Sequence, residues 1–110
     1  MVEVRIRKDS RDRLSSFFAS GHAGWDEDGQ DVVCAAVSAI LQSALLGLGE
    51  VAKVDVSSER EKGRLQMRWP PSARDDAATR AIVETAALSV EYIARQYPAH
   101  VAVIHERDDG

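Results

Sequence analysis

The sequence has one cysteine, three histidines and no asparagine among its 110 residues. A single cysteine excludes an internal disulfide and fits a reducing compartment, where thiols stay reduced. We find no apolar run of the roughly 18 residues that span a bilayer. The N-terminus reads as an alternating strand and not as a signal peptide. These absences predict a soluble, cytoplasmic protein that makes no membrane contact.

Positive charge is also scarce, because Asp and Glu outnumber Lys and Arg by 18 to 14 and the formal net charge is −4. Nucleic-acid binding needs a concentrated positive field, so direct contact with nucleic acid is not favoured. Five cations do gather near the N-terminus: Arg5, Arg7, Lys8, Arg11 and Arg13. We interpret them as the solvated edge of a hairpin. Contact with an acidic partner, RNA included, is the alternative.

The length limits the chain to one domain, residues 1–110. Hydrophobic residues make up 45% of it, which is ordinary for a globular protein and too many for a disordered one. A domain of this size has little room for a second lobe. We therefore expect a partner subunit to complete any cleft.

Apolar periodicity predicts two helices and five strands in the order ββαββαβ. The predicted elements are strand 2–7, strand 14–20, helix 32–48, strand 52–57, strand 65–69, helix 75–96 and strand 101–104, with a frayed tail over 106–110. Because hairpins join most neighbouring strands, the sheet should be mainly antiparallel, with both helices packed on it. The predicted fold class is a two-layer α+β domain.

His22 and Cys34 flank a polar loop that leads into the first predicted helix. With Asp31 as N-cap, Cys34 is the third helical residue, where backbone N–H groups lack partners inside the helix. A thiolate there gains about 0.3–1 kcal/mol, so the thiol pKa should fall below about 8.5. A neighbouring imidazolium would protonate the leaving amine after the thiolate attacks a carbonyl. We predict that His22 and Cys34 form a base–nucleophile pair.

Both residues also have plainer interpretations. A lone cysteine in a helix is commonly a small buried hydrophobe, and a lone loop histidine is commonly solvated. The group that orients the base stays open, because a chain without asparagine cannot form a Cys-His-Asn trio and an N-capping Asp31 is already engaged. Backbone carbonyls are the alternative for that role. Backbone N–H groups around Cys34 would hold an oxyanion.

The loop between the histidine and the cysteine is acidic, with Asp26, Glu27 and Asp28 in succession. These acids are interpreted as solvated, with attraction of a basic peptide as the alternative. Together with His22 and Cys34 they match no common zinc spacing, so we predict no metal and no cofactor. Trp25 is expected either to contact substrate or to anchor the loop.

Two motifs at a fixed spacing carry a family resemblance. The run Gly21-His22-Ala23-Gly24, followed by Gly29-x-Asp31-x-Val33-Cys34-Ala35-Ala36-Val37-Ser38, resembles the ribosomal-processing cysteine protease family, Prp. The resemblance implies a cytoplasmic bacterial cysteine endopeptidase that works with a Cys-His dyad as a homodimer. It also implies a substrate, the N-terminal extension of one large-subunit ribosomal protein, the twenty-seventh by name. The loop here is more acidic than in the family, which leaves the substrate preference open.

Carried onto this chain, the resemblance makes Cys34 the nucleophile and His22 the base. The other motif positions are expected to support the site (Gly21, Asp31, Ser38) or to contact the substrate (Ala23, Gly24, Trp25). Ser38 lies one helical turn after Cys34, so it either hydrogen-bonds near the site or serves as a small packing residue. A non-catalytic module that docks on the ribosome is the main alternative function. A thiol redox sensor is a weaker one, because the chain lacks a resolving cysteine.

Overall fold

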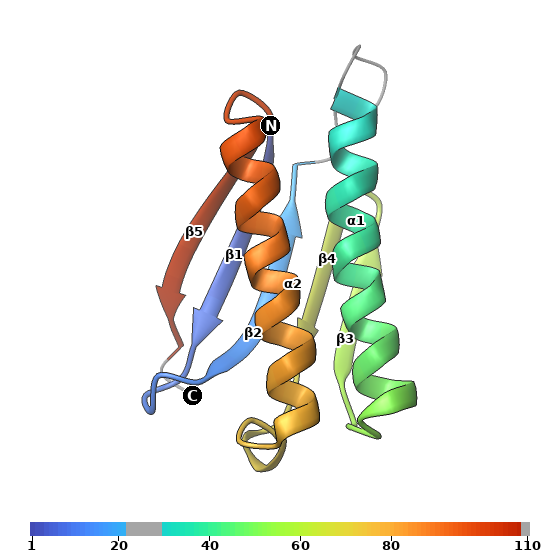
Figure 1. Cartoon of the computed structure of the whole chain (residues 1–110). Coiled ribbons are helices and arrows are strands. Elements are labelled where there is room, and N and C mark those ends of the chain that lie inside the picture. The colour runs from blue at the N-terminus through green and yellow to red at the C-terminus, as the bar shows by residue number, and fades with distance from the viewer. Residues whose placement is uncertain (22–29, 109–110) are drawn as a thin grey trace.

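The computed structural model describes residues 1–21 and 30–108, and within them it contains five strands and two long helices. The elements are β1 (Val2–Lys8), β2 (Leu14–Ser20), α1 (Gln30–Leu46), β3 (Ser57–Glu61), β4 (Arg64–Arg68), α2 (Ala77–Gln96) and β5 (Val101–Arg107). A π-helical turn, η2 (Gly47–Val51), extends α1, and a 3-10 turn, η3 (Pro71–Ala73), precedes α2. The order of strands and helices is the predicted one (Figure 1).

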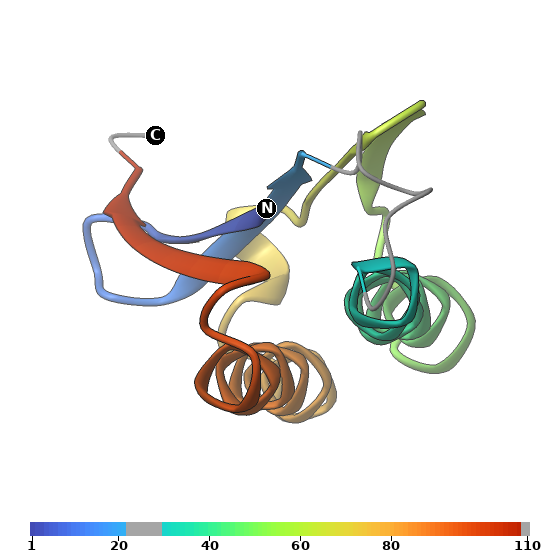
Figure 2. The ribbon, with the colours of Figure 1, turned by 90° about the horizontal axis from the view of Figure 1, so that it is seen from above.

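The strands form one sheet in the order β3-β4-β2-β1-β5. Three neighbouring pairs are antiparallel, and only β1 and β5 run parallel. Both helices lie on the same face of this sheet, and neither lies on the opposite face (Figure 2). The two-layer, mainly antiparallel α+β prediction is therefore confirmed. The parallel pair arises because α2 carries the chain back along the sheet before β5 begins.

The core lies between the sheet and the inner sides of the two helices. Its fully buried large side chains include Val2, Val4, Ile6, Phe17, Leu41, Leu48, Met67, Trp69, Val83 and Val90. The Trp69 ring meets Phe17 edge-on at a centroid distance of 5.1 Å, and its Nε1–H donates to the Leu14 carbonyl at 2.8 Å. A buried indole needs such a partner for its N–H. Trp69 is therefore anchored in the core by both packing and a hydrogen bond.

The third strand lies further along the chain than the alternation over 52–57 predicts. The η2 turn delays it: the amide of Ala52 donates to the Gly47 carbonyl at 2.9 Å, and the amide of Val54 donates to Leu48 at 2.8 Å. Val54 and Val56 are half-buried against the core without being in the sheet. The apolar alternation over 52–57 therefore reflects packing on the core and not a strand. The strand itself, β3, is an exposed and charged edge of the sheet.

Residues 106–108 of the predicted frayed tail over 106–110 are ordered, and residues 109–110 lie outside the described part of the chain. β5 continues to Arg107, and the Asp108 amide donates to the Lys8 carbonyl at 2.6 Å. Glu106 accepts from Arg5 at 2.6 Å and from Arg7 at 2.9 Å. Arg5 and Arg7 therefore lie on an inner strand of the sheet beside Glu106 of β5, and not on a solvated hairpin edge.

The 20-residue segment Val32–Val51 has the length and composition to cross a membrane, with a mean hydropathy of 2.0 over an 18-residue window. The statement that no apolar run reaches that length is therefore wrong. One side of the segment packs into the core through Val33, Val37, Leu41, Ala44 and Leu48. Core helices of soluble proteins pass the same hydropathy test, so the value alone is weak evidence for a membrane.

Candidate active site

Cys34 lies near the N-terminal end of α1, but two positions deeper than the sequence predicts. The helix begins at Gln30, so Asp31 is inside it and is not its N-cap. Glutamine is a good helix former, and the first turn therefore starts before Asp31. Cys34 becomes the fifth helical residue counted from Gln30, just inside the second turn.

The side chain of Cys34 is 0% exposed and belongs to the hydrophobic core cluster. Its neighbours on the same side of α1, Val33 and Val37, are 3% and 0% exposed. Burial is what the plainer interpretation of this cysteine predicts, so its position alone does not make it a nucleophile. A substrate carbonyl can reach the sulfur only after the sulfur is uncovered.

Several predicted site residues lie outside the described part of the chain. They are the base His22, the substrate contacts Ala23, Gly24 and Trp25, and the loop acids Asp26, Glu27 and Asp28. The base–nucleophile pair therefore stays a prediction.

Gly21 directly follows the last residue of β2, Ser20. Its φ angle is +95°, and a Cβ placed on it would lie 2.3 Å from the Met1 carbonyl oxygen. Glycine alone adopts this backbone conformation without strain and leaves room for that oxygen. Gly21 thus has a backbone reason to be glycine, and its supporting role at the site stays a prediction.

A groove of about 600 Å³ runs between α1 and the β3–β4 hairpin. Its α1 wall is formed by Ser38 and Gln42. With Cys34, these residues are spaced four apart and share one side of the helix. At 1.5 Å per residue, Ser38 and Gln42 are about 6 and 12 Å along the axis from Cys34. The groove therefore begins about one helical turn from the sulfur.

The opposite wall of this groove is polar and comes from the hairpin. Its residues are Arg60, Glu61, Lys62, Gly63, Arg64 and Leu65. The hairpin and α1 run side by side in Figure 1. A trough with one helical wall and one edge-strand wall has the shape that suits an extended peptide.

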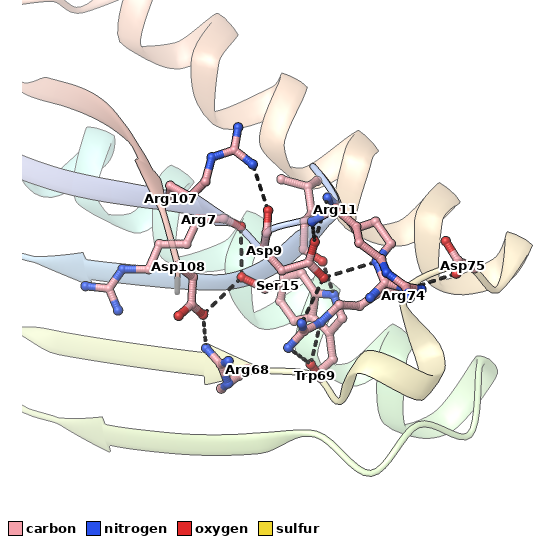
Figure 3. Close-up of polar contacts among 12 residues, drawn as sticks. Arg7, Asp9, Arg11, Ser15, Arg68, Trp69, Arg74, Asp75, Arg107 and Asp108 are labelled. Carbon is pink, nitrogen blue, oxygen red and sulfur yellow. Dashed lines mark hydrogen bonds and ion pairs between the residues drawn. The ribbon is translucent and has the colours of Figure 1, made fainter. Parts of the chain in front are cut away.

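The other end of the sheet holds a buried ion pair that the sequence patterns do not reveal (Figure 3). Asp9 and Arg74 are each 2% exposed, and Arg74 Nη1 donates to Asp9 Oδ2 at 3.0 Å. Arg74 also donates to the Trp69 carbonyl from Nε at 3.1 Å and from Nη2 at 2.8 Å. Arg13 adds a second guanidinium contact to Asp9, from Nε to Oδ2 at 3.0 Å. This cluster ties the β1–β2 turn to the segment between β4 and α2.

The protonation state of Asp9 follows from these contacts. Burial by itself raises the pKa of this carboxyl. Hydrogen bonds from the Arg13 backbone N–H, from the Arg74 side chain and from the Arg11 backbone N–H outweigh burial, so the pKa falls well below its ordinary value of 3.8. Asp9 is therefore a structural anion with its oxygens engaged, and not a proton donor for chemistry.

Within residues 1–21 and 30–108, no group of three or more His, Cys, Asp or Glu side chains is placed to hold a metal ion.

The match to a protein family gives the class of the protein. Residues 1–102, from β1 into β5, match the family described as cysteine protease Prp. The chain is thus a cysteine protease. It belongs to the Prp family, as the two motifs around His22 and Cys34 predicted.

Relatives of known function match almost the whole chain. The ribosomal processing cysteine protease Prp of Bacillus subtilis is 29% identical over 107 residues, which cover 94% of this chain and 96% of the relative. The protein of the same name from Staphylococcus aureus is 27% identical over 104 residues, covering 92% and 95%.

Solved structures share the fold. The Prp protease of S. aureus, crystallised with a substrate peptide, superposes with a TM-score of 0.85 at 20% identity, covering 96% of this chain and 99% of that one. The protein SMU.848 from Streptococcus mutans gives 0.83 at 23% identity, covering 98% and 96%. At such identities the likeness concerns the fold alone.

Proposed function

We propose that this chain is an endopeptidase that removes a short N-terminal extension from a large-subunit ribosomal protein of its host, the twenty-seventh by name. The observation that carries the proposal is the peptide-sized groove that begins about one helical turn from Cys34, in a chain of the cysteine protease Prp family. The names of the B. subtilis and S. aureus relatives support ribosomal processing as the setting.

In this proposal the chemistry needs only Cys34, His22 and water. His22 takes the thiol proton, and the sulfur attacks the scissile carbonyl carbon. Backbone N–H groups hold the oxyanion of the tetrahedral intermediate. The C–N bond then breaks, the new amine leaves with the proton from His22, and a thioester remains. Water hydrolyses the thioester, which releases the carboxylate and restores the thiol.

A second copy of the chain and a cytoplasmic setting belong to the same proposal. Large apolar side chains are exposed on the outer sides of the helices, among them Leu46 at 65%, Leu88 at 65% and Tyr92 at 55%. Such side chains are candidates for burial between subunits. Light scattering of the purified chain should give twice the monomer mass. A monomer mass at micromolar concentration would contradict the proposed homodimer.

The test of the proposed function is cleavage of the host ribosomal protein, followed by intact mass. The wild type should remove the N-terminal extension, whereas Cys34→Ala and His22→Ala should leave it in place. Ser43→Ala is the matched control, because Ser43 is exposed on the same helix away from the groove and should leave cutting unchanged. Equal cutting by the Cys34→Ala variant would contradict the proposal.

A second candidate function is a module that docks on the ribosome without chemistry. It is favoured by the helix-free face of the sheet, where the guanidinium groups of Arg7 and Arg64 lie 5.8 and 5.2 Å from the ring centre of Phe18. Acids on the same face offset much of this charge, since Glu106 binds both Arg5 and Arg7. Ribosome co-sedimentation that survives Cys34→Ala, with no cleavage by the wild type, would favour this candidate.

A further inference from the structure

We propose that Arg60 selects an acidic side chain of the substrate, about three to four residues from the cleaved bond. This inference rests on the proposed function, because it assigns a specificity to the same groove. It concerns a residue outside both of the motifs that carry the family resemblance.

The register of the hairpin sets the direction of Arg60. Arg60 of β3 is the partner of Leu65 on β4, and directly opposed residues lie on one face of a sheet. Leu65 is 7% exposed and belongs to the core, so that face is the helix side. A hydrogen bond from Arg60 Nη1 to Gln42 Oε1 at 3.2 Å shows that the side chain reaches toward α1.

Within residues 1–21 and 30–108, no acidic side chain forms an ion pair with Arg60. A guanidinium has five N–H donors, and its hydrogen-bond partner among the described residues is the neutral amide of Gln42. The next cross-strand pair differs, because Arg64 Nη1 lies 3.9 Å from Glu61 Oε2 and offsets it. Arg60 and Lys62 therefore give the hairpin wall a net positive charge. A carboxylate is the complementary group, and it can bind a guanidinium through two parallel hydrogen bonds.

Helix and strand geometry together give the position of the selected side chain. Gln42, which contacts Arg60, is eight residues after Cys34, or about 12 Å along the helix axis. An extended peptide advances about 3.3 Å per residue. A peptide that lies along the groove with its scissile carbonyl at Cys34 would thus bring its third or fourth residue to Arg60. The cleavage products reveal whether that residue precedes or follows the cut.

A charged edge strand also has a rival explanation. β3 is an edge of the sheet and all five of its residues are exposed, and charges on such edges prevent strand-to-strand aggregation. That role needs a charge on β3 but no preference in the substrate. It would also be served by a glutamate in place of Arg60.

The experiment maps cleavage sites in a degenerate peptide library by mass spectrometry of the products. For the wild type, we expect Asp and Glu to be enriched about two- to fivefold at the third or fourth residue from the cut, the range for an exposed ion pair. Arg60→Gln should abolish the enrichment, and Arg60→Glu should replace it with enrichment of Lys and Arg. High salt should weaken the wild-type preference.

Arg80→Gln is the matched control, since Arg80 is an exposed arginine on α2 that pairs with Glu84 at 3.0 Å and does not line the groove. It should keep the wild-type preference. Cleavage without an acidic preference, or a preference that persists in Arg60→Gln, would overturn the role of Arg60 and leave the proposed function standing. A wild type that cuts no peptide and no ribosomal protein would overturn both. Circular dichroism confirms that each variant is folded.

Discussion

The two ends of the sheet are built in opposite ways. At the β1–β2 turn, Asp9 and Arg74 are buried and hydrogen-bonded to each other and to nearby backbone (Figure 3). At the other end, near the start of α1, a groove is lined by charged side chains that remain exposed, and it lies beside a buried thiol. A fully satisfied polar cluster fixes structure, whereas charges left toward solvent are available to a ligand. We therefore expect one end to hold the fold together, and the proposed function places the chemistry at the other.

The largest expected effect is on activity and comes from Cys34→Ala. Loss of the nucleophile should lower kcat/KM for peptide cleavage by about 10⁴-fold or more. Replacing a small buried thiol by a methyl group should cost only about 1 kcal/mol of unfolding free energy. Steady-state kinetics and urea denaturation of the same preparation separate the two. Cleavage near the wild-type rate would remove Cys34 from the chemistry.

The largest effect on stability should come from Arg74→Met at the opposite end. This change removes the buried guanidinium partner of Asp9 and leaves only the Arg13 guanidinium on it, which costs about 3–5 kcal/mol of unfolding free energy. Arg80→Met provides the control, because its exposed pair with Glu84 is worth at most about 1 kcal/mol. Urea denaturation measures both losses. Similar values for the two variants would mean that the Asp9–Arg74 pair does not hold this end together.

Acid should loosen the same end. The folded-state pKa of Asp9 lies below its ordinary value of 3.8. The stabilisation from the Asp9 carboxylate is therefore complete above the ordinary pKa of 3.8, which the unfolded chain has. It is lost as the pH falls from about 4 toward the lowered folded-state pKa. Denaturation midpoints of the wild type between pH 7 and pH 2 should fall mainly below pH 4. A profile that is flat from pH 5 to pH 2 would contradict the assignment of Asp9.

A smaller loss is expected from Gly21→Ala, at the end that carries the thiol. The added methyl group would meet the Met1 carbonyl in a backbone conformation with positive φ, at a cost of about 1–3 kcal/mol. Gly49→Ala is the control, because a Cβ there meets no atom within 4 Å. Thermal unfolding should show a lower midpoint for the first variant and little change for the second. Equal midpoints would show that the turn at Gly21 adapts at no cost.

Much of the fold could be predicted from local patterns. The alternation of Val2, Val4 and Ile6 with polar residues predicts β1. Apolar residues that recur three and four positions apart predict both helices. The strand β3 could not be found in this way, because Ser57–Glu61 is a charged edge without an apolar residue. The start of α1 was misplaced because Gln30 carries no capping signal, while Asp31 does.

For the site, too, local patterns could be predicted from the sequence and contacts between distant segments could not. Two motifs close to one another in the sequence predict Cys34 as the nucleophile and predict the Prp family, which the family match confirms. The Asp9–Arg74 pair joins residues 65 positions apart, and Arg60 reaches Gln42 across 18 positions. Such pairs depend on how distant strands and helices meet, and no periodicity within one segment reports them.

The most direct test of the central claim is the pH dependence of Cys34 alkylation by iodoacetamide, measured by intact mass for the wild type and for His22→Gln. An activated thiol should show a rate midpoint well below about 8.5, and the midpoint should rise when the imidazole is removed. Midpoints at or above the ordinary thiol value in both proteins would contradict an activated Cys34–His22 pair.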